Sequence, residues 1–114
     1  MAHFILIHGA SHGGWCWEKV VPLLKAHGHT VVTPDMPGGG SDQTPAHKID
    51  LPLYAKKVID LVDAAPSKPV VVGHSMGGIS ITEAAEARPD KIACIVFLCA
   101  LMPVNGQYAR EITA

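Results

Sequence analysis

Residues 69–78, Pro-Val-Val-Val-Gly-His-Ser-Met-Gly-Gly, constrain the fold of this chain more than any other stretch. A short β-branched run leads into a Gly-x-Ser-x-Gly sequence formed by Gly73, Ser75 and Gly77, and a helical pattern follows directly. This order is typical of a strand that turns sharply into a helix and presents a serine at the turn. Glycines flank the serine because the close approach of strand and helix leaves no room for Cβ atoms. We therefore predict that Ser75 projects above a sheet as a nucleophile.

Predicted strands and helices alternate along the chain. We expect strands at 4–7, 30–33, 70–72 and 92–100, and their unbroken apolar runs indicate burial on both faces of a sheet. Trp17, Val20, Val21 and Leu24 recur at helical spacing, with Pro22 in the first turn and Gly28 as the end of the helix. Further helices are expected at 51–65, capped by Asp50, and at 76–87. The alternation predicts an α/β fold, a parallel sheet with helices on both faces, of about four strands and three helices.

Composition and charge argue against several kinds of partner. Nine basic and ten acidic residues give a net charge of -1 without a basic block, so no nucleic acid partner is expected. The longest apolar run, residues 92–102, is shorter than the roughly 20 residues of a membrane-spanning helix, so no membrane partner is expected either. The N-terminus lacks the basic segment of a signal peptide, and the three cysteines form an odd, scattered set. A cytoplasmic protein is the expectation.

No cofactor or metal ion is expected. The glycines at 38–40 lack the Gly-x-Gly-x-x-Gly spacing of a dinucleotide site, and no helix follows them directly. No pair of cysteines or histidines has zinc-ligand spacing together with a second pair to match it.

The chain resembles the α/β-hydrolases, and within them the small esterases related to plant methylesterases and hydroxynitrile lyases. The resemblance covers almost the whole chain and rests on residues 6–17, 28–35, 38–42, 71–78 and 91–103. It implies that residues 1–114 are the N-terminal half of a single domain, without its cap and C-terminal strands. The lyases of this group carry a threonine in place of Gly9 and a cysteine in place of Met76, so both positions favour esterase chemistry.

The resemblance also implies roles for individual residues. Ser75 would attack a small-molecule ester and form an acyl-enzyme, once a histidine oriented by a carboxylate has taken its proton. The backbone N–H groups of Ala10 and Met76 would stabilise the oxyanion of the tetrahedral intermediate. The glycines around Ala10 would then let this loop approach the substrate oxygen.

Candidates for the substrate pocket are Ser11, His12, Leu101 and Met102. For His12, a hydrogen bond within its own loop is an equally good interpretation. For Leu101 and Met102, which could form an apolar wall, core packing is equally plausible.

The remaining histidines and the tryptophans are expected to have structural roles. His74 neighbours the nucleophile, but consecutive residues at such a turn point in different directions, so we interpret it as a packing residue. His8 is expected to support its loop, and His3 to lie at the surface. Trp15 and Trp17 are both expected in the core.

The other members of a catalytic triad have no candidates in this sequence. The family order is serine, acid, histidine, yet no histidine follows Ser75. The acidic residues that follow it are Glu83, Glu86, Asp90 and Glu111, and the first three belong to the next helix and the turn after it. We therefore expect the base and the acid to be missing from this chain, which alone should be inactive. A C-terminal half or a second chain would have to complete the sheet, whose last predicted strand is apolar on both faces.

Two classes of function stay open. The first is a serine carboxylic-ester hydrolase that acts on small apolar esters through Ser75. The second is a non-catalytic ligand-binding or interaction protein on the same scaffold, because a fold does not fix a function. Hydroxynitrile-lyase-like activity is a third, weaker alternative.

Overall fold

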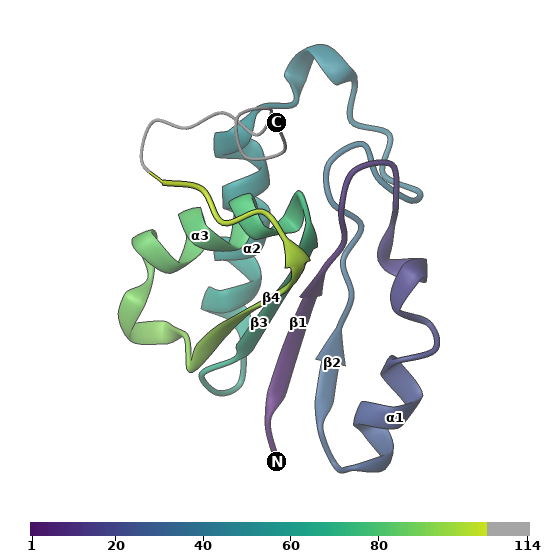
Figure 1. Cartoon of the computed structure of the whole chain (residues 1–114), viewed down its shortest axis with the longest axis vertical. Helices are drawn as coiled ribbons and strands as arrows, with labels where there is room; N and C mark the ends of the chain where they lie inside the picture. Colours follow the sequence, from purple (N-terminus) through teal and green to yellow (C-terminus); the bar gives the residue numbers. More distant parts are fainter. Residues whose placement is uncertain (105–114) are drawn as a thin grey trace.

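The computed structural model describes residues 1–104 and contains a four-stranded parallel sheet (Figure 1). The strands lie in the order β2-β1-β3-β4, and their bounds are His3–Ile7 (β1), Thr30–Val32 (β2), Val70–Ser75 (β3) and Cys94–Ala100 (β4). In the register of the sheet, Ile5 is paired with Val32 on one side and Val71 on the other. The predicted α/β class and its four strands are confirmed, with small shifts at the strand ends.

Three α-helices connect the strands and cover both faces of the sheet. Their bounds are Val21–Ala26 (α1), Leu51–Ala64 (α2) and Gly77–Ala87 (α3). Helices α2 and α3 pack against each other on one face, and α1 lies on the other (Figure 1). Short 3-10 turns at Gly14–Trp17, Ala46–Lys48 and Pro89–Lys91 complete the connections. The predicted arrangement of helices on both faces is therefore confirmed.

The core follows the two-residue period of the strands. Ile5, Ile7 and Val71 are fully buried and pack against the apolar sides of α2 and α3. Leu6 and Val72 point to the opposite face, because successive side chains of a strand alternate, and they pack with Trp17. Burial of both faces explains why β1 and β3 read as unbroken apolar runs. The same expectation is wrong for β4, which lies at the edge of the described sheet and leaves Val96 and Leu98 exposed.

The helix boundaries follow their sequence signals with one exception. Asp50 caps α2, where its side chain accepts a hydrogen bond from the Leu53 backbone N–H at 2.9 Å. Gly28 has a φ of +84° just past the end of α1, a conformation that favours glycine. Helix α1 is shorter than the apolar spacing from Trp17 predicts. Proline is tolerated only in a first helical turn, and Pro22 accordingly stands at the start of α1.

Two further expectations about burial are wrong. Trp15 is 58% exposed although Trp17 is buried. In a 3-10 turn with three residues per turn, side chains two apart point in different directions, so only one of the two indoles can face the core. His3 is buried, because β1 lies inside the sheet between β2 and β3, and its Nδ1 lies 2.7 Å from Thr30 Oγ1.

Within residues 1–104, no helix combines the length and apolar character needed to cross a bilayer.

Candidate active site

Ser75 is the last residue of β3 and adopts a φ of +56°, which is uncommon for any residue other than glycine. Helix α3 begins two residues later, at Gly77, so the chain reverses its direction over one or two peptide units. The pairing of β3 with β4 is irregular here: His74 is paired with Leu98 and Ser75 with Ala100, so Cys99 is left out. The Leu101 backbone N–H donates to the Ser75 carbonyl oxygen at 3.0 Å, which fixes the turn from the neighbouring strand.

The glycines around Ser75 allow three backbone segments to meet. A Cβ atom on Gly73 would lie 2.8 Å from the Gly77 carbonyl oxygen, and one on Gly77 would lie 2.8 Å from the Ile7 carbonyl oxygen. Contacts this short do not occur between real Cβ atoms and their neighbours. The steric reason for the Gly-x-Ser-x-Gly sequence therefore holds in the structure.

The loop after β1 lies directly against Ser75. A Cβ atom on Gly9 would lie 2.8 Å from Ser75 Cβ and 3.3 Å from Ser75 Oγ. The peptide between Gly9 and Ala10 is thus placed beside Ser75, the predicted nucleophile, and Met76 follows Ser75 in the chain. The arrangement has the proximity that an oxyanion hole formed by the Ala10 and Met76 N–H groups requires, and those donor roles remain a prediction.

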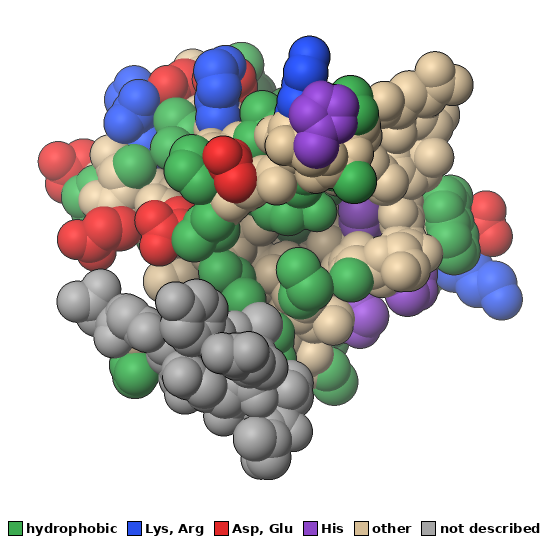
Figure 2. Space-filling view, turned by 90° about the horizontal axis from the view of Figure 1, so that it is seen from above, with side chains coloured by type: hydrophobic (Ala, Val, Ile, Leu, Met, Phe, Trp, Pro, Cys, Tyr) green, Lys and Arg blue, Asp and Glu red, His purple; other side chains and the backbone are tan. Residues whose placement is uncertain are grey.

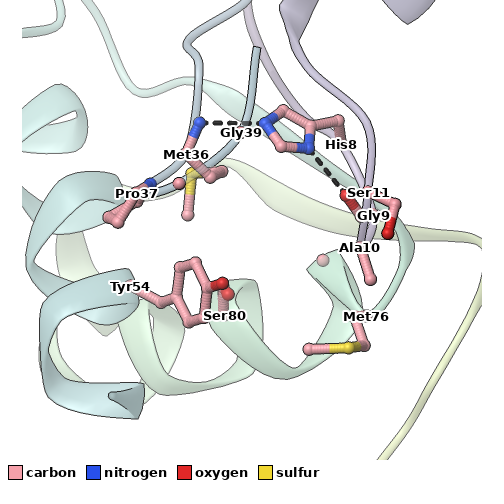
Figure 3. Close-up of a pocket in the computed structure, with 12 residues that line it drawn as sticks. His8, Gly9, Ala10, Ser11, Met36, Pro37, Gly39, Tyr54, Met76 and Ser80 are labelled. Carbon is pink, nitrogen blue, oxygen red and sulfur yellow. Dashed lines mark hydrogen bonds between the residues drawn. The ribbon is translucent and has the colours of Figure 1, made fainter. Parts of the chain in front are cut away.

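A cleft opens beside this loop at the carboxyl ends of the strands (Figure 3). Seen from that end, hydrophobic side chains surround a hollow near the middle of the molecule (Figure 2). The cleft is lined by residues of the loops after β1 and β2 and of helices α2 and α3: His8, Gly9, Ala10, Ser11, Met36, Pro37, Gly38, Gly39, Tyr54, Met76, Gly77 and Ser80.

The predicted pocket residues do not all meet in this cleft. Ser11 lines it, and so do Ala10 and Met76. His12, Leu101 and Met102 are not among its lining residues. Leu101 lies against the first turn of α3 instead, where its carbonyl oxygen occupies the place that a Cβ atom on Gly78 would need. Met102 is 64% exposed.

Sequence reasoning missed most of the residues that line the cleft, Met36, Pro37, Tyr54 and Ser80 among them. Met36 and Pro37 follow β2 at the same edge of the sheet as Ser75, and the rule that ligands bind at the carboxyl ends of parallel strands could have found them. Ser80 lies four residues after Met76, which places it on the same face of α3. Tyr54 belongs to the apolar stripe of α2, and nothing in that pattern distinguishes it from a core residue.

Four aromatic rings lie beside the same turn. His12 stacks on Trp15 with ring centroids 5.5 Å apart, and its Nδ1 lies 2.9 Å from the Ala10 carbonyl oxygen. The hydrogen bond within its own loop that we considered for His12 is thus present. His74 meets His12 and Trp17 edge to face, at 6.2 and 6.4 Å. These contacts agree with a packing role for His74.

Two carboxylates organise the loop after β2. Asp35 accepts hydrogen bonds from the Gly14 N–H at 2.7 Å, the Ser41 N–H at 3.1 Å and the Ser41 hydroxyl at 2.9 Å. These bonds, the one from Gly14 first, lower the pKa of Asp35 and join this loop to the loop after β1. Asp42 accepts from the N–H groups of Gly38 and Thr44, and hydrogen bonds, that from Gly38 first, lower its pKa to about 2. Asp42 therefore holds the backbone of Gly38, which lines the cleft, and Asp35 holds together two loops that contribute residues to it.

The described residues supply no partner for the Ser75 hydroxyl of the kind a triad needs. Within residues 1–104, no hydrogen bond joins Ser75 Oγ to a histidine, and no three His, Cys, Asp or Glu side chains gather as metal ligands. Glu83 and Glu86 are exposed on α3, and Asp90 is exposed on the 3-10 turn that precedes β4. Glu111 lies outside the described residues.

Comparison with known proteins gives a consistent result. The family model described as the alpha/beta hydrolase fold matches residues 2–111. The chain is 42% identical over 109 residues to a probable esterase, PIR7A, of Oryza sativa subsp. indica, with 93% of this chain and 41% of that protein covered. It is 44% identical over 106 residues to methylesterase 1 of Arabidopsis thaliana, with 89% of this chain and 40% of that protein covered.

The crystal structure of polyneuridine aldehyde esterase superimposes with a TM-score of 0.89 at 33% identity, over 99% of this chain and 46% of the other. The chain therefore spans less than half of the length of these relatives.

Proposed function

The chain belongs to the α/β-hydrolase family, and on that premise we propose that it carries the nucleophile of a serine carboxylic-ester hydrolase. The observation that supports this most is the backbone at Ser75. A non-glycine residue at a φ of +56° stores strain, and such strain is concentrated at functional sites. Here it turns the serine toward the loop that contains Gly9 and Ala10. Relatives named as esterases and methylesterases support the same chemistry.

The proposed reaction has two halves. Ser75 Oγ bonds to the ester carbonyl carbon while a histidine takes the hydroxyl proton, and the N–H groups of Ala10 and Met76 stabilise the resulting oxyanion. Collapse of the tetrahedral intermediate breaks the bond to the alcohol, which leaves with a proton from the histidine. Water then attacks the acyl-enzyme by the same route and releases the acid. We propose that the histidine and its carboxylate come from a further segment of the protein or from a second chain.

The cleft supports a small apolar ester as the substrate. Its side chains are mainly Met36, Pro37, Tyr54 and Met76, which can surround an alkyl or aryl group without offering it a charge. The only hydroxyl groups among the cleft-lining residues of the described chain belong to Ser11, Tyr54 and Ser80.

The position of Gly9 adds a steric argument against the lyase alternative. A side chain there would meet Ser75 Cβ at 2.8 Å, so a threonine would require the loop or the turn to move. The geometry around Ser75 is thus fitted to glycine, as the resemblance to the esterases implies.

The three cysteines support the proposed cytoplasmic location, because Cys16, Cys94 and Cys99 are all free thiols.

Covalent labelling with a fluorophosphonate probe tests the proposed function, since the probe reacts only with an activated serine. The complete gene product is used, with the reading frame followed past Ala114. We expect one label, lost in Ser75→Ala and kept in the control Ser67→Ala, which removes an exposed turn serine. Absence of labelling in a folded wild-type protein would favour a non-catalytic binding role instead.

A further inference from the structure

His8 joins the two loops that border the cleft. The residue is 5% exposed and follows β1. Its Nε2 accepts a hydrogen bond from the Met36 backbone N–H at 2.9 Å, and its Nδ1 lies 2.7 Å from the Gly9 carbonyl oxygen (Figure 3). The two partners are on different loops, so the ring spans from one to the other.

These two contacts determine the tautomer of the ring. A backbone N–H can only donate, so Nε2 must carry a lone pair and no hydrogen. A carbonyl oxygen can only accept, so Nδ1 must carry the hydrogen. The hydrogen-bond network therefore assigns His8 as the neutral Nδ1-protonated form, with both nitrogens satisfied.

The ring has little freedom to leave this orientation. Gly39, on the loop after β2, lies so close to it that a Cβ atom there would be 2.5 Å from His8 Cε1 and 2.8 Å from His8 Nε2. The imidazole is thus held by a hydrogen bond at each nitrogen and by backbone contact at Cε1.

The Gly9 carbonyl belongs to the same planar peptide unit as the Ala10 N–H. A hydrogen bond that fixes the direction of the oxygen therefore also fixes the direction of the N–H. Donation to the oxygen polarises the peptide as well, which makes its N–H a better donor by about 10–30% per bond. Gly9 is the residue that lies against Ser75, so this peptide unit stands beside the nucleophile.

We propose that His8, as the neutral Nδ1-protonated tautomer, is a positioning residue that orients and polarises the Gly9–Ala10 peptide for oxyanion binding. The role rests on the proposed function, in which the Ala10 N–H is an oxyanion donor. His8 lines the cleft, but this role needs no contact between its side chain and the substrate. It acts through the peptide, so its loss should lower kcat much more than it changes KM.

Two substitutions separate the two hydrogen bonds. In His8→Asn, the side-chain amide nitrogen reaches the place of Nδ1 and can donate to the Gly9 carbonyl, while the bond from Met36 is lost. In His8→Gln, the amide oxygen reaches the place of Nε2 and can accept from Met36, while the donor to Gly9 is lost. In the complete gene product we expect His8→Asn to retain most of kcat on a small aryl ester, and His8→Gln to lose up to about 100-fold.

The controls are His47→Asn and His47→Gln, which change an exposed histidine and should leave kcat unchanged. Equal kcat in the two His8 variants, or a smaller loss in His8→Gln, would overturn the proposal, because the bond to Met36 would then be the one that matters.

A second measurement does not depend on turnover. Nitrogen NMR of the wild-type protein should show a protonated Nδ1 and an unprotonated Nε2 on His8, and the Ala10 amide shift should move in His8→Gln much more than in His8→Asn. The opposite tautomer, or an unmoved Ala10 amide, would refute the role of His8. If Ser75→Ala left turnover unchanged, the proposed function would fail, and these spectra would still decide whether His8 fixes the peptide.

Discussion

Replacement of Gly9 by alanine tests how closely the site depends on the approach of two backbone segments. The φ of Gly9 lies outside the left-handed region, so the backbone itself accepts alanine. The new Cβ atom would lie 2.8 Å from Ser75 Cβ and 3.1 Å from the His74 carbonyl oxygen. Because two carbon atoms rest at about 3.5–4.0 Å, the loop and the turn must separate by about 1 Å.

That displacement should lower the free energy of unfolding moderately and the reaction rate strongly. Overpacking of this kind costs about 1–3 kcal/mol of the free energy of unfolding. A shift of about 1 Å between Ser75, the proposed nucleophile, and the proposed oxyanion donors can reduce a reaction rate by about 100-fold. We therefore expect a folded, moderately destabilised protein whose Ser75 reacts far more slowly with a fluorophosphonate.

The same substitution at Gly28 provides the matched control. A Cβ atom on Gly28 meets nothing within 4 Å, but its φ of +84° strains any other residue, so Gly28→Ala should cost about 1–2 kcal/mol. Urea unfolding should show similar losses for both variants, and only Gly9→Ala should lose labelling rate. The reasoning would be refuted if both variants kept a wild-type labelling rate, or if both lost it in proportion to their stability.

Three further predictions concern the acidic residues and the isolated chain. Asp42 has its pKa lowered from 3.8 to about 2, so its contribution to stability is present above pH 3.8 and is lost as the pH falls to about 2. The gap in melting temperature between wild type and Asp42→Asn should accordingly close over that range, and a gap that persists below pH 2 would contradict the cause we assign. Asp50→Ala removes the cap of α2 and should cost about 1 kcal/mol in urea unfolding, whereas Asp60→Ala, which loses an exposed ion pair with Lys56, should cost under about 0.5 kcal/mol. The isolated 114-residue chain should not turn over an aryl acetate, because no histidine of residues 1–104 forms a hydrogen bond with Ser75 Oγ, and turnover by a monodisperse sample that Ser75→Ala abolishes would overturn this.

The sequence predicts a strand or a helix end well where a single local signal, such as an apolar run or a capping residue, specifies it. Unbroken β-branched runs located the strands, and Asp50 and Gly28 marked helix ends that the structure confirms. The interpretation failed where two positions carried equal signals. Trp15 and Trp17 are the same residue type two apart, and only the 3-10 geometry decides which of them is buried.

The candidate site likewise has one part that the sequence predicts and one part that it does not. The tight turn at Ser75 could be predicted because its steric demands fall on residues within two positions of it. The cleft could not, because Met36, Tyr54 and Ser80 meet only after β2, α2 and α3 have packed. The two hydrogen bonds of His8 illustrate the limit: the one to Gly9 is local, and the one from Met36 joins residues 28 apart.

The groups proposed for the reaction and the side chains that form the cleft walls come from different parts of the fold, so the substrate preference of the site could change independently of its chemistry. The groups that we propose residues 1–104 contribute to the reaction are backbone N–H groups and one serine, held by close approaches that leave no room for side chains at Gly9, Gly73 and Gly77. The walls of the cleft are side chains from other elements, and Met36 and Tyr54 contribute to the core rather than to the turn. Substitutions there can alter the shape of the cleft without moving Ser75 relative to the Gly9–Ala10 peptide. Selectivity among small esters should therefore vary through the loop after β2 and through α2, while the turn and the loop after β1 stay fixed.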